Sequence, residues 1–350
     1  MRSEIRQALR RASAASHPDR AVRPRRSRRG AVRRSALLFA GTAAIVALGA
    51  CEDQPQAQVR TAAALRWAPP VLTEPTTIDL STGVSKLALD RDRDYILRMP
   101  AEKKVGATWL IGGRNIVIVG GHTTIPRGTP PGRANDGYRR NIYINDATGT
   151  VHIEGLLIDG SGGGAADGID VSAPEATVQI QNVRIVGLRG QHAGFHADVV
   201  QPWGGVKDLR IDRLTGSTNY QGLQIVGPGP IGSAEISNVN LFQTAGPYHR
   251  GGHMIWLAGE GCASAKITLE NVWVKPRRGR WLGDSVWPQD RRTFARRRSC
   301  VGRASRTVAS WPKLPVTGVV RAGAPPSGDV VPKGSVGIGY PYGAGAQLGP

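Results

Sequence analysis

Two aspartates at matching places in neighbouring segments are the residues best suited to acid–base chemistry. Asp170 and Asp198 each lie between two apolar residues. Alternate side chains of an extended segment point to opposite faces, so both carboxylates are predicted to face outward, one strand spacing of about 4.8 Å apart. Two carboxylates this close are expected to share a proton, share a cation or splay apart into solvent.

Each of these three outcomes predicts a different role for the pair. A shared proton gives an acid–base pair at about the 5 Å separation of retaining glycosidases, with His196 on the same strand face as a proton shuttle. A shared cation gives a calcium site, with Asp167 as a third carboxylate beside Asp170 and Asp198. If the two carboxylates splay apart into solvent, they are ordinary surface groups without a functional role.

Polar and aromatic residues surround the two aspartates in the sequence. Such side chains suit sugars, because their polar groups bond to hydroxyls and their aromatic planes pack on sugar rings. The residues expected to bind substrate in this way are Tyr143, Gln201, Trp203, Tyr220, Gln224 and Trp256.

The segments that position these residues repeat about every 27 residues. Five short apolar segments align on Ile153, Ile180, Ile211, Ile236 and Leu269, at spacings of 27, 31, 25 and 33 residues. One repeat of this length cannot bury its apolar face and must stack on its neighbours, which predicts a solenoid. A second, interleaved set of segments has the same period and is expected to align Tyr143, Asp170, Asp198, Gln224 and Trp256 in one outward column.

The repeat resembles the right-handed parallel β-helix of the pectate-lyase-like superfamily over residues 76–275. Asn182, Asn238 and Asn271 share one aligned position, where that superfamily shows a ladder of stacked asparagines. The resemblance implies an all-β solenoid that cleaves polysaccharide by elimination or hydrolysis, with acidic glycan as one candidate substrate. The motifs of its lyases and hydrolases are not found in this sequence, so no catalytic residue is carried over, and a non-catalytic glycan-binding or adhesion protein is the alternative.

The first fifty residues have the features of an export signal. Arg33-Arg34 precede an apolar run at residues 35–50, which is too short to span a bilayer as a helix but fits the apolar region of a signal peptide. Leu48-Gly49-Ala50-Cys51 resembles the lipobox of bacterial lipoproteins. We therefore expect residues 1–50 to be the signal, Cys51 to be lipidated and to anchor the exported protein to the membrane, and residues 51–75 to form a flexible tether.

Positive charge is concentrated outside the predicted repeat. The formal net charge is +20, but residues 1–50 contain twelve Arg against two acidic residues, and residues 276–306 contain ten Arg against two. The near-neutral remainder argues against nucleic acid as a partner. We expect residues 276–350 to form an irregular Arg-rich loop, either solvated or bound to a polyanion, followed by a Pro/Gly-rich segment along the solenoid.

The remaining cysteines predict a covalent link. In an exported protein, Cys262 and Cys300 are expected to form a disulfide between the last clear repeat and the Arg-rich segment. The sequence has no cysteine spacing typical of zinc sites and no nucleotide-binding fingerprint, so calcium is the only cofactor considered. We expect a monomer.

Overall fold

The computed structural model describes residues 65–128, 136–191, 194–246, 252–259, 264–289 and 300–341, all within one compact unit, Val59–Pro350. The predicted signal, Cys51 and Cys262 lie outside the described residues. No helix in the described ranges is long and apolar enough to cross a membrane. The elements in these ranges are β1 (Thr76–Asp79), β2 (Ser85–Leu89), β3 (Tyr95–Arg98), β4 (Lys104–Val105), β5 (Thr108–Gly112), β6 (Ile116–Val119), β7 (His122–Thr124), η1 (Asp136–Arg139), β8 (Arg140–Asn145), β9 (Thr150–Glu154), β10 (Leu157–Asp159), β11 (Asp167–Leu188), β12 (Asp198–Thr218), β13 (Gln221–Gln224), β14 (Ile231–Gln243), β15 (Ile255–Trp256), β16 (Lys266–Lys275), η2 (Leu282–Asp284), β17 (Val286–Trp287), β18 (Arg303–Ala304), β19 (Val308–Ser310) and β20 (Val316–Ala322).

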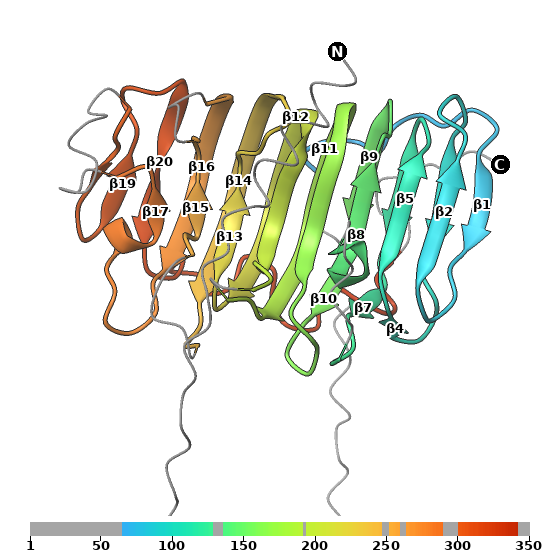
Figure 1. Ribbon diagram of the computed structural model, residues 1–350, viewed down its shortest axis with the longest axis horizontal. Coiled ribbons are helices and arrows are strands. Elements are labelled where there is room, and N and C mark those ends of the chain that lie inside the picture. Colours follow the sequence, from blue (N-terminus) through green and yellow to red (C-terminus); the bar gives the residue numbers. More distant parts are fainter. Residues whose placement is uncertain are drawn as a thin grey trace, which may run out of the picture. The chain divides into compact units, whose positions relative to one another are not determined.

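The aligned apolar segments stack in parallel with the predicted register (Figure 1). Ile153 pairs with Ile180, Ile180 with Ile211, Ile211 with Ile236, and Ile236 with Leu269. All five side chains are buried in one continuous core, as expected for repeats that bury their apolar faces against their neighbours. The first register predicted from the sequence is therefore confirmed.

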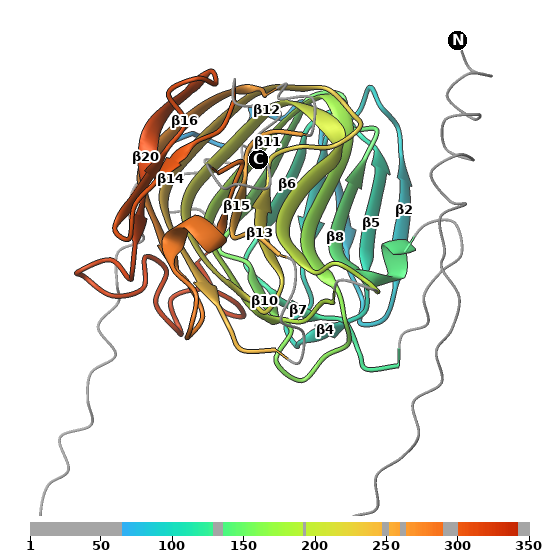
Figure 2. The same cartoon turned by 60° about the vertical axis from the view of Figure 1, so that its left-hand side comes forward.

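The described chain is almost entirely β-structure in one long, mostly parallel sheet. Figure 2 shows the chain winding in successive turns whose strands stack side by side. Antiparallel pairing among the described strands occurs between β18 and β19 and between β19 and β20. This arrangement is consistent with a β-helix.

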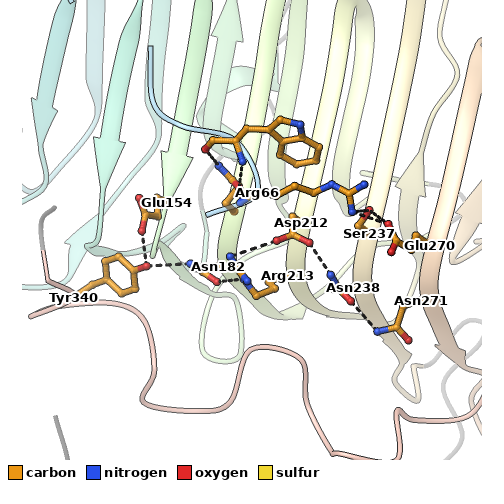
Figure 3. Close-up of polar contacts among 12 residues, drawn as sticks. Arg66, Glu154, Asn182, Asp212, Arg213, Ser237, Asn238, Glu270, Asn271 and Tyr340 are labelled. Atoms are coloured by element: carbon orange, nitrogen blue, oxygen red, sulfur yellow. Dashed lines mark hydrogen bonds and ion pairs between the residues drawn. The ribbon is translucent and has the colours of Figure 1, made fainter. Parts of the chain in front are cut away.

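A sharp corner follows each aligned apolar segment of the first register, directly after β9 and within the long strands β11, β12, β14 and β16. The corner residue has a left-handed backbone conformation, with φ of 51° at Asn182, 49° at Asn238 and 52° at Asn271. Glycine and asparagine adopt this conformation at low cost, which explains the aligned asparagines. Asn271 donates to Asn238 Oδ1 over 2.8 Å, while Gly155 and Arg213 take the corner in the other two repeats (Figure 3).

The C-terminal segment lies along these corners. Tyr340 donates its hydroxyl hydrogen to Glu154 Oε1 over 2.6 Å and accepts a hydrogen bond from Asn182 over 3.1 Å (Figure 3). A Cβ atom on Gly155 would lie 2.2 Å from the Tyr340 ring, so only glycine fits at that corner. Asp329 accepts hydrogen bonds from Arg184 over 2.7 Å and from Asn240 over 3.2 Å. The segment thus joins repeats that are distant in the sequence.

Two regions predicted to be irregular are more ordered than expected. In the described part of the predicted tether, the backbone N–H groups of Arg66 and Trp67 donate to Gln181 Oε1, and Arg66 forms an ion pair with Glu270 (Figure 3). In the predicted Arg-rich loop, β17 pairs in parallel with β15, and in the Pro/Gly-rich segment that was expected along the solenoid, β20 pairs in parallel with β16 and so continues the stack beyond Lys275. Side-chain bonds hold the first segment in place, and backbone pairing between strands holds the second.

Candidate functional site

The second register differs from the prediction at one strand. Asp170 pairs with Tyr143, as expected, but its partner on β12 is Gln201 rather than Asp198. Asp198 pairs with Gln221 on β13. The start of β12 can be aligned with β11 in two ways, because Val199 and Val200 are adjacent and each can serve as an apolar residue of the alternating pattern. One alignment places Asp198 beside Asp170, and the other, three residues further on, places Gln201 there. The predicted stacking of Asp198 on Asp170 is therefore wrong.

The observed pairing creates two neighbouring rows of side chains across the strands. We call them the aromatic row and the acidic row. The first follows the pairs from β5 to β17, and its step from β12 to β13 extends the register by one residue beyond the pair of Val200 with Leu223. The second contains the pair of Arg140 with Asp167 and the pair of Asp198 with Gln221. It reaches His253 by extending the register of β13 with β15. The aromatic row is Trp109, Tyr143, Asp170, Gln201, Gln224, Trp256 and Trp287, and the acidic row is Arg140, Asp167, Asp198, Gln221 and His253.

The three aspartates are buried, whereas the sequence predicted an exposed column. Asp167, Asp170 and Asp198 are 2%, 1% and 0% exposed. Side chains of the adjacent rows lie against them: Arg140 contacts Asp170, and Gln221 donates to Asp198 Oδ1 over 2.7 Å. Outward direction on a strand thus does not mean contact with solvent where two rows of long side chains meet.

Burial separates the proton affinities of Asp170 and Asp198. Burial raises the pKa of Asp198 to about 8, against the hydrogen bond from Gln221, and the charge of Asp170 adds to the rise. Burial raises the pKa of Asp170 to about 6, and the adjacent Arg140 guanidinium limits that rise. At neutral pH, Asp198 therefore holds a proton and Asp170 carries a negative charge.

Asp167 supports the other two aspartates. Its Oδ1 atom accepts the backbone N–H of Asp198 over 2.8 Å, which fixes the start of β12. Burial and the charges of Asp198 and Asp170 raise the pKa of Asp167 well above its usual range. Its Oδ2 atom lies 3.8 Å from Arg140 Nε.

A guanidinium takes the position that was predicted for calcium. Arg140 lies against both Asp167 and Asp170, and so supplies the positive charge that two close carboxylates need. Within the described ranges, no group of three or more His, Cys, Asp or Glu side chains is arranged to hold a metal ion. Asp167, Asp170 and Asp198 therefore lie close together without forming the predicted ligand set.

Several buried polar atoms of this region have no hydrogen-bond partner within the described part of the chain. They include Trp109 Nε1, Asn141 Oδ1, Asp170 Oδ1, Asp198 Oδ2 and His253 Nδ1. Buried polar atoms in proteins are nearly always paired, and exceptions call for an explanation. The unpaired carboxylate and imidazole atoms of the two rows can bond to water or to a polar ligand.

The other predicted site residues divide into two groups. Tyr143, Gln201, Gln224 and Trp256 all lie in the aromatic row, as described above. His196 precedes β12 and is exposed, and its ring centre lies 4.9 Å from that of the buried Tyr220. Burial, with a smaller effect from the charge of Asp198, raises the pKa of Tyr220 to about 12. The Trp203 side chain is 46% exposed on β12.

Sequence reasoning missed Arg140 and Trp287. Arg140 precedes Tyr143 by three residues, as Asp167 precedes Asp170, so the 27-residue period carried a signal for it. The guanidinium carbon of Arg140 lies 4.5 Å from the centre of the Tyr143 ring, so this side chain connects the acidic row to the aromatic row. Trp287 had no such signal, because it lies in a segment that breaks the repeat.

Comparisons with protein-family models, with curated proteins and with solved structures found no match to this chain. The function must therefore be argued from the geometry and electrostatics of the two rows.

Proposed function

We propose that the chain is a right-handed parallel β-helix of the pectate-lyase-like kind that hydrolyses polysaccharide. The observation that carries this proposal is the pair of buried carboxylates whose pKa values are raised to about 8 at Asp198 and about 6 at Asp170. Glycoside hydrolysis needs one carboxylic acid and one carboxylate at the same pH. The pair meets this need between pH 6 and pH 8.

Each carboxyl group presents one unpaired oxygen for the reaction. Asp198 Oδ1 accepts a hydrogen bond from Gln221, so its proton belongs on Oδ2, which has no partner in the described part of the chain. That proton passes to the glycosidic oxygen as the bond to the anomeric carbon breaks. Asp170 Oδ1 then either takes a proton from the attacking water or attacks the anomeric carbon itself.

Hydrolysis fits the described residues better than elimination. Elimination removes the proton beside a uronate carboxylate, which requires a base and a cation that neutralises the substrate carboxylate. In the acidic row, Arg140 already lies against Asp167 and Asp170. The carboxylate of a uronate substrate would therefore lie beside the negative charge of Asp170 and be repelled.

A second candidate function is glycan binding without cleavage. The exposed Trp203 and the half-buried Trp256 and Trp287 favour it, since aromatic planes suit sugar rings whether or not chemistry follows. In both cases we propose polysaccharide as the partner of an exported monomer that is held at the membrane by lipid on Cys51. Nucleic acid is not proposed as a partner.

Turnover of a polysaccharide panel by the full-length chain tests this proposal. The variants Asp170→Asn and Asp198→Asn should lose activity by at least about a hundredfold, as expected when a catalytic acid or base is removed. Asp79→Asn, a carboxylate that is 79% exposed on β1, is the matched control and should keep activity. Hydrolysis leaves new reducing ends, whereas elimination leaves an unsaturated uronate that absorbs in the ultraviolet.

The outcomes of this experiment separate the candidates. Equal activity of the parent and both site variants would place catalysis elsewhere. Binding without turnover in the parent would support the non-catalytic function. An ultraviolet-absorbing product would overturn hydrolysis.

A further inference from the structure

Two buried glutamines on β13 connect the proposed acid to the aromatic row. Gln221 is 2% exposed and Gln224 is 5% exposed. The Gln221 amide nitrogen donates to Asp198 Oδ1 over 2.7 Å and also donates to Gln224 Oε1. One side-chain amide thus contacts a residue of each row. We call Gln221 and Gln224 the amide pair.

The backbone that carries the amide pair is fixed on both sides. The Gln221 N–H group donates to the carbonyl oxygen of Ala197 over 3.3 Å, just before β12. The Gly222 N–H group donates to the carbonyl oxygen of His253 over 3.0 Å. A Cβ atom on Gly222 would lie 2.2 Å from the Met254 carbonyl oxygen, so only glycine allows this close approach. The Gln221 side chain therefore starts from a backbone with little freedom to move relative to the acid.

Two arrangements of the amide pair would satisfy its hydrogen bonds while Asp198 is protonated. In the observed arrangement, the Gln221 amide nitrogen donates to two oxygen atoms, and the acid proton lies on Asp198 Oδ2. If both amides were turned over, Gln221 Oε1 would accept the acid proton from Oδ1 and a second hydrogen from Gln224. The proton would then be held inside the protein instead of on the unpaired oxygen.

Loss of the proton distinguishes the two arrangements. An ionised carboxylate only accepts hydrogen bonds. In the observed arrangement, Gln221 donates to Asp198 Oδ1 before and after the proton leaves. In the turned arrangement, Gln221 Oε1 would face a negatively charged oxygen atom. The observed arrangement is therefore the one that suits an acid that gives up its proton and takes it back.

The hydrogen bond from Gln221 acts against the other influences on Asp198. Burial raises the pKa of Asp198 to about 8 and the charge of Asp170 adds to the rise, whereas the hydrogen bond from Gln221 opposes it. The titratable side chains whose charges interact with that of Asp198 are Asp167 and Asp170, both in contact with Arg140, and Tyr220. Gln221 is thus the neutral donor beside a carboxyl group with two carboxyl neighbours.

We propose that Gln221 is a positioning residue that keeps the proton of Asp198 on Oδ2, and that Gln224 holds the Gln221 amide in the orientation this requires. The inference rests on the proposed function and deepens it, because it names what regulates the proton of the acid. Gln221 acts through Asp198 and, being buried, does not contact the sugar. A proton on Oδ2 can pass to the glycosidic oxygen, whereas a proton on Oδ1 would remain in the bond to Gln221.

The pH dependence of turnover in the full-length chain tests this role, with the polysaccharide that the parent cleaves fastest as the substrate. Methionine has a size close to that of glutamine but donates no hydrogen bond, so Gln221→Met should preserve the packing. The upper limb of the pH–kcat profile should move upward by about one unit from about pH 8. The plateau value of kcat should fall about tenfold, while KM should change by less than about twofold.

A double variant shows whether Gln224 acts through Gln221. Gln224→Met should move the upper limb in the same direction by a smaller amount. In the double variant, the limb should lie where Gln221→Met alone places it, because Gln224 has no amide left to hold. Gln179→Met is the control and should leave both limbs in place, because Gln179 is buried on β11 and bonds to His152 rather than to an aspartate.

A measurement without turnover separates this inference from the proposed catalysis. Carbon-13 NMR titration of labelled aspartate carboxyl groups gives the pKa of Asp198, whose signal is assigned by its loss in Asp198→Asn. Gln221→Met should raise this pKa by about one unit. If Gln221→Met does not fold, as checked by circular dichroism, Gln224→Met keeps Gln221 in place and should show the same change to a smaller extent.

The outcomes distinguish the amide pair from hydrolysis. A raised pKa in Gln221→Met, with a parent that cleaves nothing, would support the role of Gln221 and reject hydrolysis. Cleavage by the parent, with the pKa and the upper limb unmoved in Gln221→Met, would support hydrolysis and overturn the role of Gln221. Additive shifts in the double variant would overturn the role of Gln224.

Discussion

Replacing Asp198 by Asn should stabilise the protein at neutral pH. The folded state raises the pKa of Asp198 from 3.8 to about 8 through burial, so the folded chain keeps a proton that the unfolded chain releases. Unfolding is therefore favoured progressively as the pH rises from about 4 to about 8. Asparagine has no proton to release, and its side-chain oxygen can still accept the hydrogen bond from Gln221.

The size of the effect follows from the difference in pKa. Each unit corresponds to about 1.4 kcal/mol, and pH 7 lies about three units above the ordinary pKa of Asp. The Asn variant should thus gain up to about 4 kcal/mol in unfolding free energy at pH 7 and almost nothing near pH 3.5. The gain in unfolding free energy reaches its full size above pH 8 and does not change at higher pH.

Urea denaturation of the full-length chain between pH 3.5 and pH 9, followed by circular dichroism, measures this difference. The exposed Asp79→Asn variant is the control and should follow the parent across the range. A constant difference between the parent and Asp198→Asn at every pH, or a loss of stability at pH 7, would refute the argument that Asp198 is buried with a bound proton. Loss of activity together with gain of stability is the pattern expected of a catalytic group.

Four other predictions follow from the described contacts and from the sequence. Arg140→Met removes the positive charge beside Asp170, so the lower limb of the pH–activity profile should move upward from about pH 6, and an unmoved limb would exclude this pairing. Gly155→Ala should cost about 2 kcal/mol or more in thermal unfolding, because its φ is 66° and Tyr340 fills the space, whereas Gly128→Ala, with φ of 77° and open space, should cost less. Cys51→Ala should release the protein from the membrane fraction or leave the precursor unprocessed, and unchanged fractionation would count against lipidation. Mass analysis before and after reduction should show a Cys262–Cys300 disulfide, and two free thiols in the purified protein would reject it.

Sequence reasoning succeeded where a backbone constraint marks the repeat. Each apolar segment of the first register is followed, two residues after its aligned residue, by a left-handed corner at Gly155, Asn182, Arg213, Asn238 or Asn271. This corner fixed the alignment, and the structure has the predicted pairs. The second register has no comparable marker, so the adjacent valines before Gln201 permitted a shift of three residues.

Burial and side-chain contacts at the site could not be predicted from the alternation of apolar and polar residues. Alternation gives the direction of a side chain but not the length of its neighbours, so it did not show that Arg140 and Gln221 contact the aspartates. The raised pKa values of Asp170 and Asp198 depend on that burial. The pairs of Tyr143 with Asp170 and of Gln224 with Trp256 were therefore predictable, whereas the pairing of Asp198 and the guanidinium between the carboxylates were not.

The two terminal segments have a consequence for the way this molecule loses its structure. In a stack of repeats that contact only their neighbours, unfolding can begin at one end and proceed repeat by repeat. Here Arg66 bonds to Ser237 and Glu270 while the adjoining backbone bonds to Gln181, and the segment that contains Tyr340 bonds to other repeats. These bonds connect repeats that are not neighbours in the stack. The central repeats, which contain the aspartates, should therefore unfold together in one cooperative step rather than one after another from an end.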